Sequence, residues 1–328
     1  MIVSFSSWGV FFLPDYFNPL TKKTTRRGFL RGLGGFLANH WLLTALPMGG
    51  ASMLAWSEYD TLNLKLEKWD LYYPALPAQL EGKTIVQLSD LHLESLQITP
   101  EHISKTITPL KPDLIVITGD VINTRTDLDK VLSYLSPLEA RYGRFIVMGN
   151  NDYSHFSRTL FNRYLGLLRG MGWIPLLNES VYLSDLSLWI IGIDDPATAH
   201  DDVSKAYATL KAETLEAPKK NLAPPPFRLA LAHSSDCLDD VVKYGADLLL
   251  TGHTHGGQIR LPGLKPFITN TYLGDEGIYE GYHVIDEVPL YINRGLGESE
   301  IPLRLNVPPE ITFFTLHKGD SEARHTIR

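Results

Sequence analysis

Five short, mainly apolar runs, each followed by a polar residue, constrain the fold of this chain more than any other feature. The runs occupy residues 85–89, 114–118, 145–148, 229–232 and 248–251, and they end at Asp90, Gly119-Asp120, Gly149-Asn150, His233 and Gly252-His253. Continuous apolar runs of this length predict strands that are buried on both faces. The polar residues therefore all follow the carboxyl end of a predicted strand.

Helical patterns alternate with these runs. Residues 101–110, 128–138 and 237–244 are predicted helices, residues 158–171 an amphipathic helix, residues 189–193 a further strand, and the polar segment 199–222 a surface insertion. The alternation predicts a layered α/β fold. Because ligands of such sheets bind at the carboxyl ends of the strands, we expect the polar residues to meet at one edge.

The polar residues form five motifs that are rich in His and Asp. These are Asp90-Leu-His92, Gly119-Asp120, Gly149-Asn150-Asn151-Asp152, His233 and Gly252-His253-Thr254-His255. In extended backbone, residues i and i+2 point the same way, so both ends of a D-x-H or H-x-H motif can converge on one site. Imidazole and carboxylate ligands suit Mn, Fe or Zn. The prediction is a pair of divalent metal ions, with Mn favoured, that activates water against a phosphate group.

Composition excludes several other classes of site. Cys237 is the only cysteine, which rules out an intrachain disulfide and a cysteine-based zinc site. The formal net charge of −7 argues against a general nucleic-acid binder, because such proteins carry a clustered surplus of Lys and Arg. Phosphate chemistry must therefore rest on a local site.

Taken in this order, the motifs resemble those of the calcineurin-like metallophosphoesterase superfamily, which run D-x-H, G-D, G-N-H-D, H and G-H-x-H. The resemblance implies a catalytic domain over residues 83–318, built as an α/β sandwich of two mixed β-sheets flanked by helices. It also implies a ligand set: Asp90, His92 and His255 for the first metal, Asn150, His233 and His253 for the second, and Asp120 bridging both. On the same resemblance, Asp120, Asn150, Asn151 and His253 are the catalytic positions.

The C-terminal part looks like a bacterial, membrane-associated branch of that superfamily. The resemblance rests on Gly256-Gly257-Gln258, on residues 293–297 and on several later positions, of which Arg304 is one. Since a guanidinium group suits phosphate, Arg294 and Arg304 are predicted to contact the substrate. The alternative for both is a structural salt bridge.

Asn151 departs from the family pattern, which has histidine at that position. Asparagine cannot act as an acid near neutral pH. A phosphate leaving group needs no proton, because it is already a stable anion, so the substitution favours anhydride cleavage. The UDP-2,3-diacylglucosamine pyrophosphohydrolases of lipid A synthesis also lack this histidine. The resemblance thus implies release of UMP and 2,3-diacylglucosamine 1-phosphate from that nucleotide-sugar lipid, unless His155 supplies the missing acid. The apolar segment 156–173 is expected to fit such a lipid.

Residues 1–60 are predicted to form a membrane-associating segment. An apolar stretch at 1–13 is followed by a basic cluster that consists of Lys22, Lys23, Arg26, Arg27 and Arg31. After the cluster, residues 32–56 contain no Lys, Arg, Asp or Glu. The second apolar stretch is long enough to span a bilayer, but its glycines, Asn39 and Pro47 also allow an in-plane segment or a soluble extension.

The basic cluster gives two expectations for localisation. Residues 25–31 (TRRGFLR) resemble a twin-arginine export signal, and a basic patch on anionic lipid is the alternative. The favoured location is the bacterial inner membrane with the catalytic domain on its cytoplasmic face. The competing functions are an exported phosphodiesterase or phosphatase that acts on envelope lipids or polymers, and a non-catalytic scaffold.

Overall fold

The computed structural model describes residues 52–123, 128–154, 157–210, 225–261, 264–266, 269–299 and 301–326. All described strands belong to one compact unit, Ala55–Arg328, and Met1–Leu54 form a second unit. The basic cluster, the twin-arginine motif and His155 lie outside the described residues. Within the described ranges, no helix is both long and apolar enough to cross a membrane.

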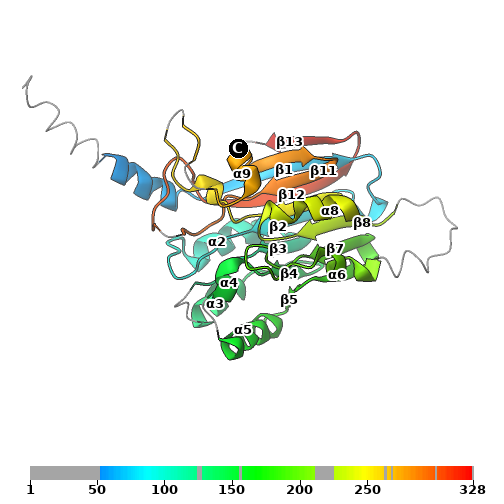
Figure 1. Ribbon diagram of the computed structural model, residues 1–328, viewed down its shortest axis with the longest axis horizontal. Coiled ribbons are helices and arrows are strands. Elements are labelled where there is room, and N and C mark those ends of the chain that lie inside the picture. The colour runs from blue at the N-terminus through cyan, green and yellow to red at the C-terminus, as the bar shows by residue number, and fades with distance from the viewer. Residues whose placement is uncertain are drawn as a thin grey trace, which may run out of the picture. The chain divides into compact units, whose positions relative to one another are not determined.

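The first sheet has seven strands in the order β13-β1-β12-β2-β3-β4-β5 (Figure 1). Their bounds are β1 Lys65–Tyr73, β2 Thr84–Leu88, β3 Leu114–Thr118, β4 Arg144–Val147, β5 Trp173–Pro175, β12 Glu310–Lys318 and β13 Glu322–Thr326. Strands β2 to β5 pair in parallel, while β12 is antiparallel to β2, and β13 is antiparallel to β1. The sheet therefore extends beyond residues 83–318 at both ends.

The second sheet has six strands in the order β10-β11-β9-β8-β7-β6. Their bounds are β6 Glu179–Leu183, β7 Leu188–Gly192, β8 Phe227–Leu231, β9 Leu248–Thr251, β10 Gly281–Ile285 and β11 Val288–Ile292. The four central strands are parallel and both edge strands are antiparallel. The two mixed sheets implied by the family resemblance are thus present.

Helices flank both sheets (Figure 1). Residues 52–62 are helical, and the α-helices that follow are α2 Pro100–Ile107, α3 Leu128–Leu135, α4 Asn150–Ser154, α5 Arg158–Gly170, α6 Val203–Ala206, α8 Leu238–Tyr244 and α9 Tyr272–Glu276. Short 3-10 turns occur at η1 Ala78–Leu80, η2 Thr108–Leu110, η3 Ser184–Leu186, η4 Ser235–Cys237 and η5 His255–Gly257. The predicted helices and strands are confirmed to within a few residues, although part of the insertion at 199–222 is not described.

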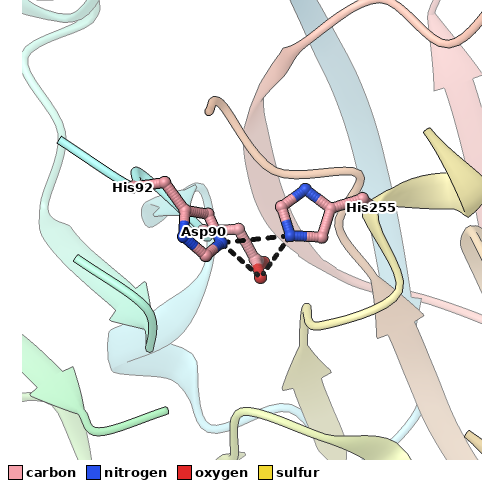
Figure 2. Close-up of side chains that lie close together, drawn as sticks. All are labelled: Asp90, His92 and His255. Atoms are coloured by element: carbon pink, nitrogen blue, oxygen red, sulfur yellow. Dashed lines mark hydrogen bonds and ion pairs between the residues drawn. The ribbon is translucent and has the colours of Figure 1, made fainter. Parts of the chain in front are cut away.

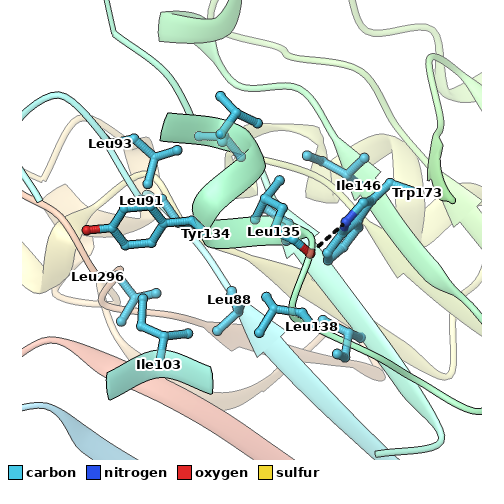
Figure 3. Packing of buried hydrophobic residues seen from close by; sticks show 14 of the residues in the cluster. Leu88, Leu91, Leu93, Ile103, Tyr134, Leu135, Leu138, Ile146, Trp173 and Leu296 are labelled. Carbon is cyan, nitrogen blue, oxygen red and sulfur yellow. Dashed lines mark hydrogen bonds between the residues drawn. The ribbon is translucent and has the colours of Figure 1, made fainter. Parts of the chain in front are cut away.

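Three layers of buried side chains explain why the central strands are apolar throughout. In β3, Ile115 and Ile117 point into the cluster under α2, α3 and α5, which Figure 3 shows in part. Leu114 and Val116 point the other way, into the cluster between the two sheets. A third cluster lies on the outer face of the second sheet. Because successive strand residues face opposite sides, a strand between two clusters needs apolar residues at every position.

Helix α5 narrows the expectation that residues 156–173 accommodate a lipid, because part of this segment belongs to the core. Its residues Tyr164, Leu165 and Leu168 are buried in the cluster beneath the first sheet. Trp173, in β5, joins the same cluster and donates a hydrogen bond from its indole nitrogen to the carbonyl of Leu135 at 3.4 Å (Figure 3). The buried side chains of this segment therefore complete the core, whereas Phe161 and Leu167 are only partly buried.

Candidate metal centre

The five motifs lie at the carboxyl ends of strands from both sheets. Loops after β2, β3 and β4 in the first sheet meet loops after β8 and β9 in the second. Backbone hydrogen bonds join neighbouring loops within each sheet. In the first sheet, Asp90 N donates to Gly119 O and His92 N to Asp120 O, both at 3.0 Å, and in the second sheet Gly252 N donates to His233 O at 2.8 Å. The site therefore forms along the seam where the two sheets adjoin, rather than at the edge of one sheet.

The first group of candidate ligands consists of Asp90, His92 and His255, all buried. His92 Nε2 and His255 Nε2 face each other at 3.1 Å. Asp90 Oδ1 lies 3.4 Å from His255 Nε2 and 4.0 Å from His92 Nε2. Figure 2 shows the three side chains, which come from two loops, pointing at one small volume.

The second group consists of Asp120, His233 and His253. His233 Nε2 lies 3.0 Å from His253 Nδ1 and 3.3 Å from Asp120 Oδ2. Asn150 Oδ1 is 3.2 Å from the same nitrogen, so its amide oxygen joins the group. Asp120 Oδ2 also lies 3.5 Å from His92 Nε2 of the first group, which places this carboxylate between the two groups.

The donor atoms fit divalent cations. Within each group the ligand atoms lie within 4.8 Å of one another, and imidazole nitrogens with carboxylate oxygens are the donors that such ions take. Nitrogen atoms that face each other at close to 3 Å share at most one proton, whereas a cation between them accepts both lone pairs. The geometry therefore brings together all seven predicted ligands in two sets joined by Asp120.

Protonation states in the site favour a cation. Burial alone would raise the pKa of Asp120, but His233, His92 and a hydrogen bond from Asn151 hold that pKa well below its usual range. Burial lowers the pKa of His255 to about 3. Burial and the neighbouring His233 lower the pKa of His253. Ionised carboxylate and neutral imidazole are the forms that bind metal.

His233 behaves differently from the other imidazoles. Burial would lower its pKa, yet the adjacent charge of Asp120 raises that pKa well above the ordinary value. A proton on His233 thus compensates the buried carboxylate. A divalent ion would provide the same compensation and displace the proton, so metal binding at this group should release protons.

Tight turns hold most of the ligands in place. Asp90, His92, Asp120, His253 and His255 all have φ between 42° and 70°. This left-handed conformation is uncommon for residues with a side chain and costs on the order of 1–3 kcal/mol each. Extended backbone at the D-x-H and H-x-H motifs was the basis for predicting that their side chains converge. The ligands converge instead because their loops bend sharply.

Asp152 and Gly149 hold the Asp120 turn. The buried carboxylate of Asp152 accepts N–H groups from Gly149 and Asp120 at 2.9 Å each, and from Val121 and Ile122 at 3.2 Å each. A side chain at Gly149 would overlap the carboxylate of Asp120. Asp152 stood in the predicted motif without a role, and the structure gives it one as a positioning residue.

Asn151 faces the bridging carboxylate. Its backbone N–H donates to Asp120 Oδ1 at 2.8 Å, and its side-chain amide donates to Asp120 Oδ2 at 2.7 Å. The side chain is half-buried, so it lies at the margin of the site. Asn151 can therefore orient Asp120 but offers no titratable proton.

Arg294 and Arg304 adopt the alternative that the sequence left open. Arg294 forms ion pairs with Glu67 at 2.5 Å and with Glu310 at 2.7 Å. Arg304 is fully buried, lies 4.0 Å from Glu298, and donates hydrogen bonds to three backbone carbonyls, those of Arg294, Gly297 and Val307. Because most of their N–H donors are engaged inside the fold, this arrangement disfavours the predicted contact with substrate phosphate.

Two acidic residues that follow β7 were not among the predicted site residues. Asp194 accepts a hydrogen bond from the hydroxyl of Tyr153 at 2.7 Å, and Asp195 is fully buried and among the charges that raise the pKa of His233. Both residues follow the apolar run 189–193. The signal that located the other motifs, a polar residue just past a buried strand, was therefore present here as well.

Comparison with known proteins agrees with this geometry. The family model described as calcineurin-like phosphoesterase matches residues 83–257. Two uncharacterized metallophosphoesterases of Bacillus subtilis (strain 168) are similar: YkuE is 33% identical over 90% of this chain and 98% of its own length, and YkoQ is 31% identical over 73% and 84%. A Chlamydia muridarum protein named UDP-2,3-diacylglucosamine pyrophosphatase LpxG is 29% identical over 84% of this chain and 96% of its own.

The family match covers more than half of the chain, and the similarity to YkuE extends along nearly its whole length. The matched residues include the motifs that build both candidate metal groups. The chain therefore belongs to the calcineurin-like phosphoesterase family and is a metal-dependent phosphoesterase.

Proposed function

We propose that this phosphoesterase cleaves a phosphate anhydride at the membrane, namely UDP-2,3-diacylglucosamine, and releases UMP and 2,3-diacylglucosamine 1-phosphate. The observation that carries the proposal is Asn151, which replaces an acid with an amide bound to Asp120. The two Chlamydia proteins named for this activity support the choice of substrate at 29% identity each.

Two divalent ions, for which Mn is the favoured identity, would be held by the ligand groups around Asp120 and would supply an activated hydroxide and charge stabilisation. Asp152 fixes the turn on which Asp120 lies, and Asn151 orients the Asp120 carboxylate through two N–H donors. His233 and His253, on neighbouring loops, close the second group.

The leaving group decides between the possible reactions. General acid catalysis contributes about 10²–10⁴-fold where an alkoxide must be protonated. Asn151 cannot contribute this acceleration, because its side chain has no titratable proton. A leaving phosphate, such as that of a sugar 1-phosphate or UMP, departs as a stable anion and does not need it. The site is thus suited to anhydrides more than to simple alkyl esters.

The direct test measures UMP release from UDP-2,3-diacylglucosamine by the full chain with Mn²⁺. Wild type should release UMP, and Asp120→Ala should not. Asn151→His should leave anhydride cleavage within a few-fold of wild type while it raises cleavage of an alkyl phosphodiester by about 10²-fold, within the range for a general acid. A wild-type protein that binds Mn²⁺ and leaves the UDP-lipid intact would contradict the proposal.

The twin-arginine-like residues 25–31 favour a second candidate function. In that case the chain is an exported phosphodiesterase or phosphatase for envelope lipids or polymers, whereas the first candidate places the catalytic domain on the cytoplasmic face of the inner membrane. A C-terminal reporter fusion that can be exported in the folded state separates the two. Activity of that reporter outside the cytoplasm would favour export, and activity in the cytoplasm alone would exclude it.

A further inference from the structure

The helix that enters the catalytic unit has three polar residues inside and its large apolar residues outside, together with the exposed Glu58. Residues 52–62 are helical, and within the catalytic unit this helix buries Ser57, Asp60 and Thr61, which are 3%, 4% and 1% exposed. Trp56 and Leu62 are 54% and 48% exposed. Surface helices of soluble proteins normally show the opposite arrangement.

Hydrogen bonds explain why the polar face points inward. Ser57 Oγ donates to the carbonyl of Arg304 at 2.7 Å, and Arg304 N donates to Thr61 Oγ1 at 2.9 Å. The backbone N–H of Asn306 donates to the Asp60 carboxylate at 2.5 Å. This face is therefore fixed to residues 304–306, and the helix cannot rotate its apolar side inward without losing these bonds.

The outward face combines two aromatic residues with a leucine. Tyr59 is 58% exposed, and its ring centroid lies 5.9 Å from that of Trp56. Trp56 Nε1 donates to Asn306 Oδ1 at 3.2 Å. Ile301, on the chain segment that leads to residues 304–306, is 49% exposed. Tryptophan and tyrosine are enriched where an apolar medium meets a polar one, because each has an apolar body and a polar tip.

The amino-acid sequence that precedes the helix indicates the kind of partner that suits this face. Residues 32–56 lack Lys, Arg, Asp and Glu and lead directly into the helix, and five basic residues lie between positions 22 and 31. An apolar stretch with a basic cluster suits a bilayer that carries anionic headgroups. A second copy of the chain is the alternative occupant of the apolar face, and its docking would not require lipid.

We propose that Trp56, Tyr59 and Leu62 dock on an anionic lipid bilayer and orient the catalytic unit on it. The docked helix is bonded to Arg304, whose guanidinium lies 3.5 Å from His255 Nδ1 in the first ligand group. The bilayer contact and the metal centre are therefore joined through one loop. The inference rests on the proposed function in one respect only, which is that docking would give a lipid-linked substrate a route to the metal centre.

Depth-resolved fluorescence tests the docking. A Cys237→Ala full-length chain, in which the buried thiol is gone, receives a single environment-sensitive label at Tyr59→Cys or, as the matched control, at Val284→Cys, a residue that is 60% exposed on β10. Each protein is added to phosphatidylglycerol–phosphatidylethanolamine vesicles with or without brominated acyl chains. We expect a blue shift and severalfold stronger quenching by bromolipid at position 59 than at position 284.

Equal, weak quenching at both positions on vesicle-bound protein would overturn the proposal. A blue shift at position 59 that appears without lipid and rises with protein concentration would also overturn it, in favour of a second copy. Hydrolysis of soluble bis(4-nitrophenyl) phosphate must stay unchanged in both labelled proteins. Quenching at position 59 without turnover of the UDP-lipid would leave the docking intact and remove only the proposed substrate.

Discussion

Two buried, charged regions lie side by side in this protein, and only one of them has the geometry of a binding site. In the metal centre, imidazole nitrogens face each other at 3.0 and 3.1 Å. In the arginine network, which we define as Arg294 and Arg304 with Glu67, Glu298 and Glu310, the guanidinium groups meet carboxylates or carbonyl oxygens. Burial and charge are common to both. Imidazole nitrogens that face one another around buried carboxylates distinguish the metal centre.

The backbone shows the same contrast. Five of the metal-centre residues have positive φ, whereas none of the arginine-network residues does. Strained backbone of this kind persists only where the surrounding structure enforces it, and it clusters at functional sites. The comparison predicts that changes in the network act mainly on stability and changes in the centre mainly on activity.

Arg304→Met should give the largest effect on stability. The substitution keeps a long apolar stem but leaves the buried Glu298 without its opposite charge. Breaking one partner of a buried pair costs about 3–5 kcal/mol in the free energy of unfolding. Urea denaturation of metal-free protein measures this, with the exposed Arg324→Met as the control. A loss as small as that of the control would mean that the network does not stabilise the fold.

Asp120→Asn should show the reverse pattern. The substitution keeps the size of the side chain and removes the charge between the two ligand groups. We expect turnover of any phosphoester substrate to fall by about 10²–10³-fold or more, the loss typical of one preorganised electrostatic group. The unfolding free energy of metal-free protein should change less than it does in Arg304→Met. The comparison between the two regions would break down if Asp120→Asn unfolded the protein instead.

Glu298→Gln should change how stability depends on pH. Burial raises the pKa of Glu298 to about 7, against the opposing charge of Arg304. A carboxyl whose pKa is higher in the folded than in the unfolded state favours folding at low pH, and this contribution is lost as pH rises from about 4.5 through 7. Its size is on the order of 2–3 kcal/mol. Urea unfolding at pH 5 and pH 7.5 should show a smaller decline in Glu298→Gln than in wild type, and equal declines would refute the assignment.

Sequence reasoning located the part of the fold that is buried on both faces. Strands β2, β3, β4, β8 and β9 were predictable because each carries apolar residues at nearly every position. Strand β1 was not predicted, because its sequence KLEKWDLYY mixes charged and apolar residues and its partner β12 lies more than 200 residues away. Strands with a half-exposed face give only a weak periodic signal.

The candidate ligands were predictable for a similar reason, since each follows a buried strand. The sharp turns at His92 and His255 were not, because positive φ in residues other than glycine leaves only a weak mark in the sequence, an enrichment of Asn, Asp and His. The surroundings of Arg304 were equally hidden. Its bonds to the carbonyls of Arg294 and Gly297 depend on how distant loops pack. A sequence shows which residues carry charge, and only the fold shows whether that charge is already neutralised.

The central claim is that two metal groups share one carboxylate, and metal titration tests it most directly. Metal-free wild-type protein is titrated with Mn²⁺ and followed by calorimetry and electron paramagnetic resonance. We predict two equivalents per chain, proton release on binding, and a spin-coupled spectrum that is lost in Asp120→Asn. A single equivalent with an uncoupled spectrum, unchanged by Asp120→Asn, would contradict the claim.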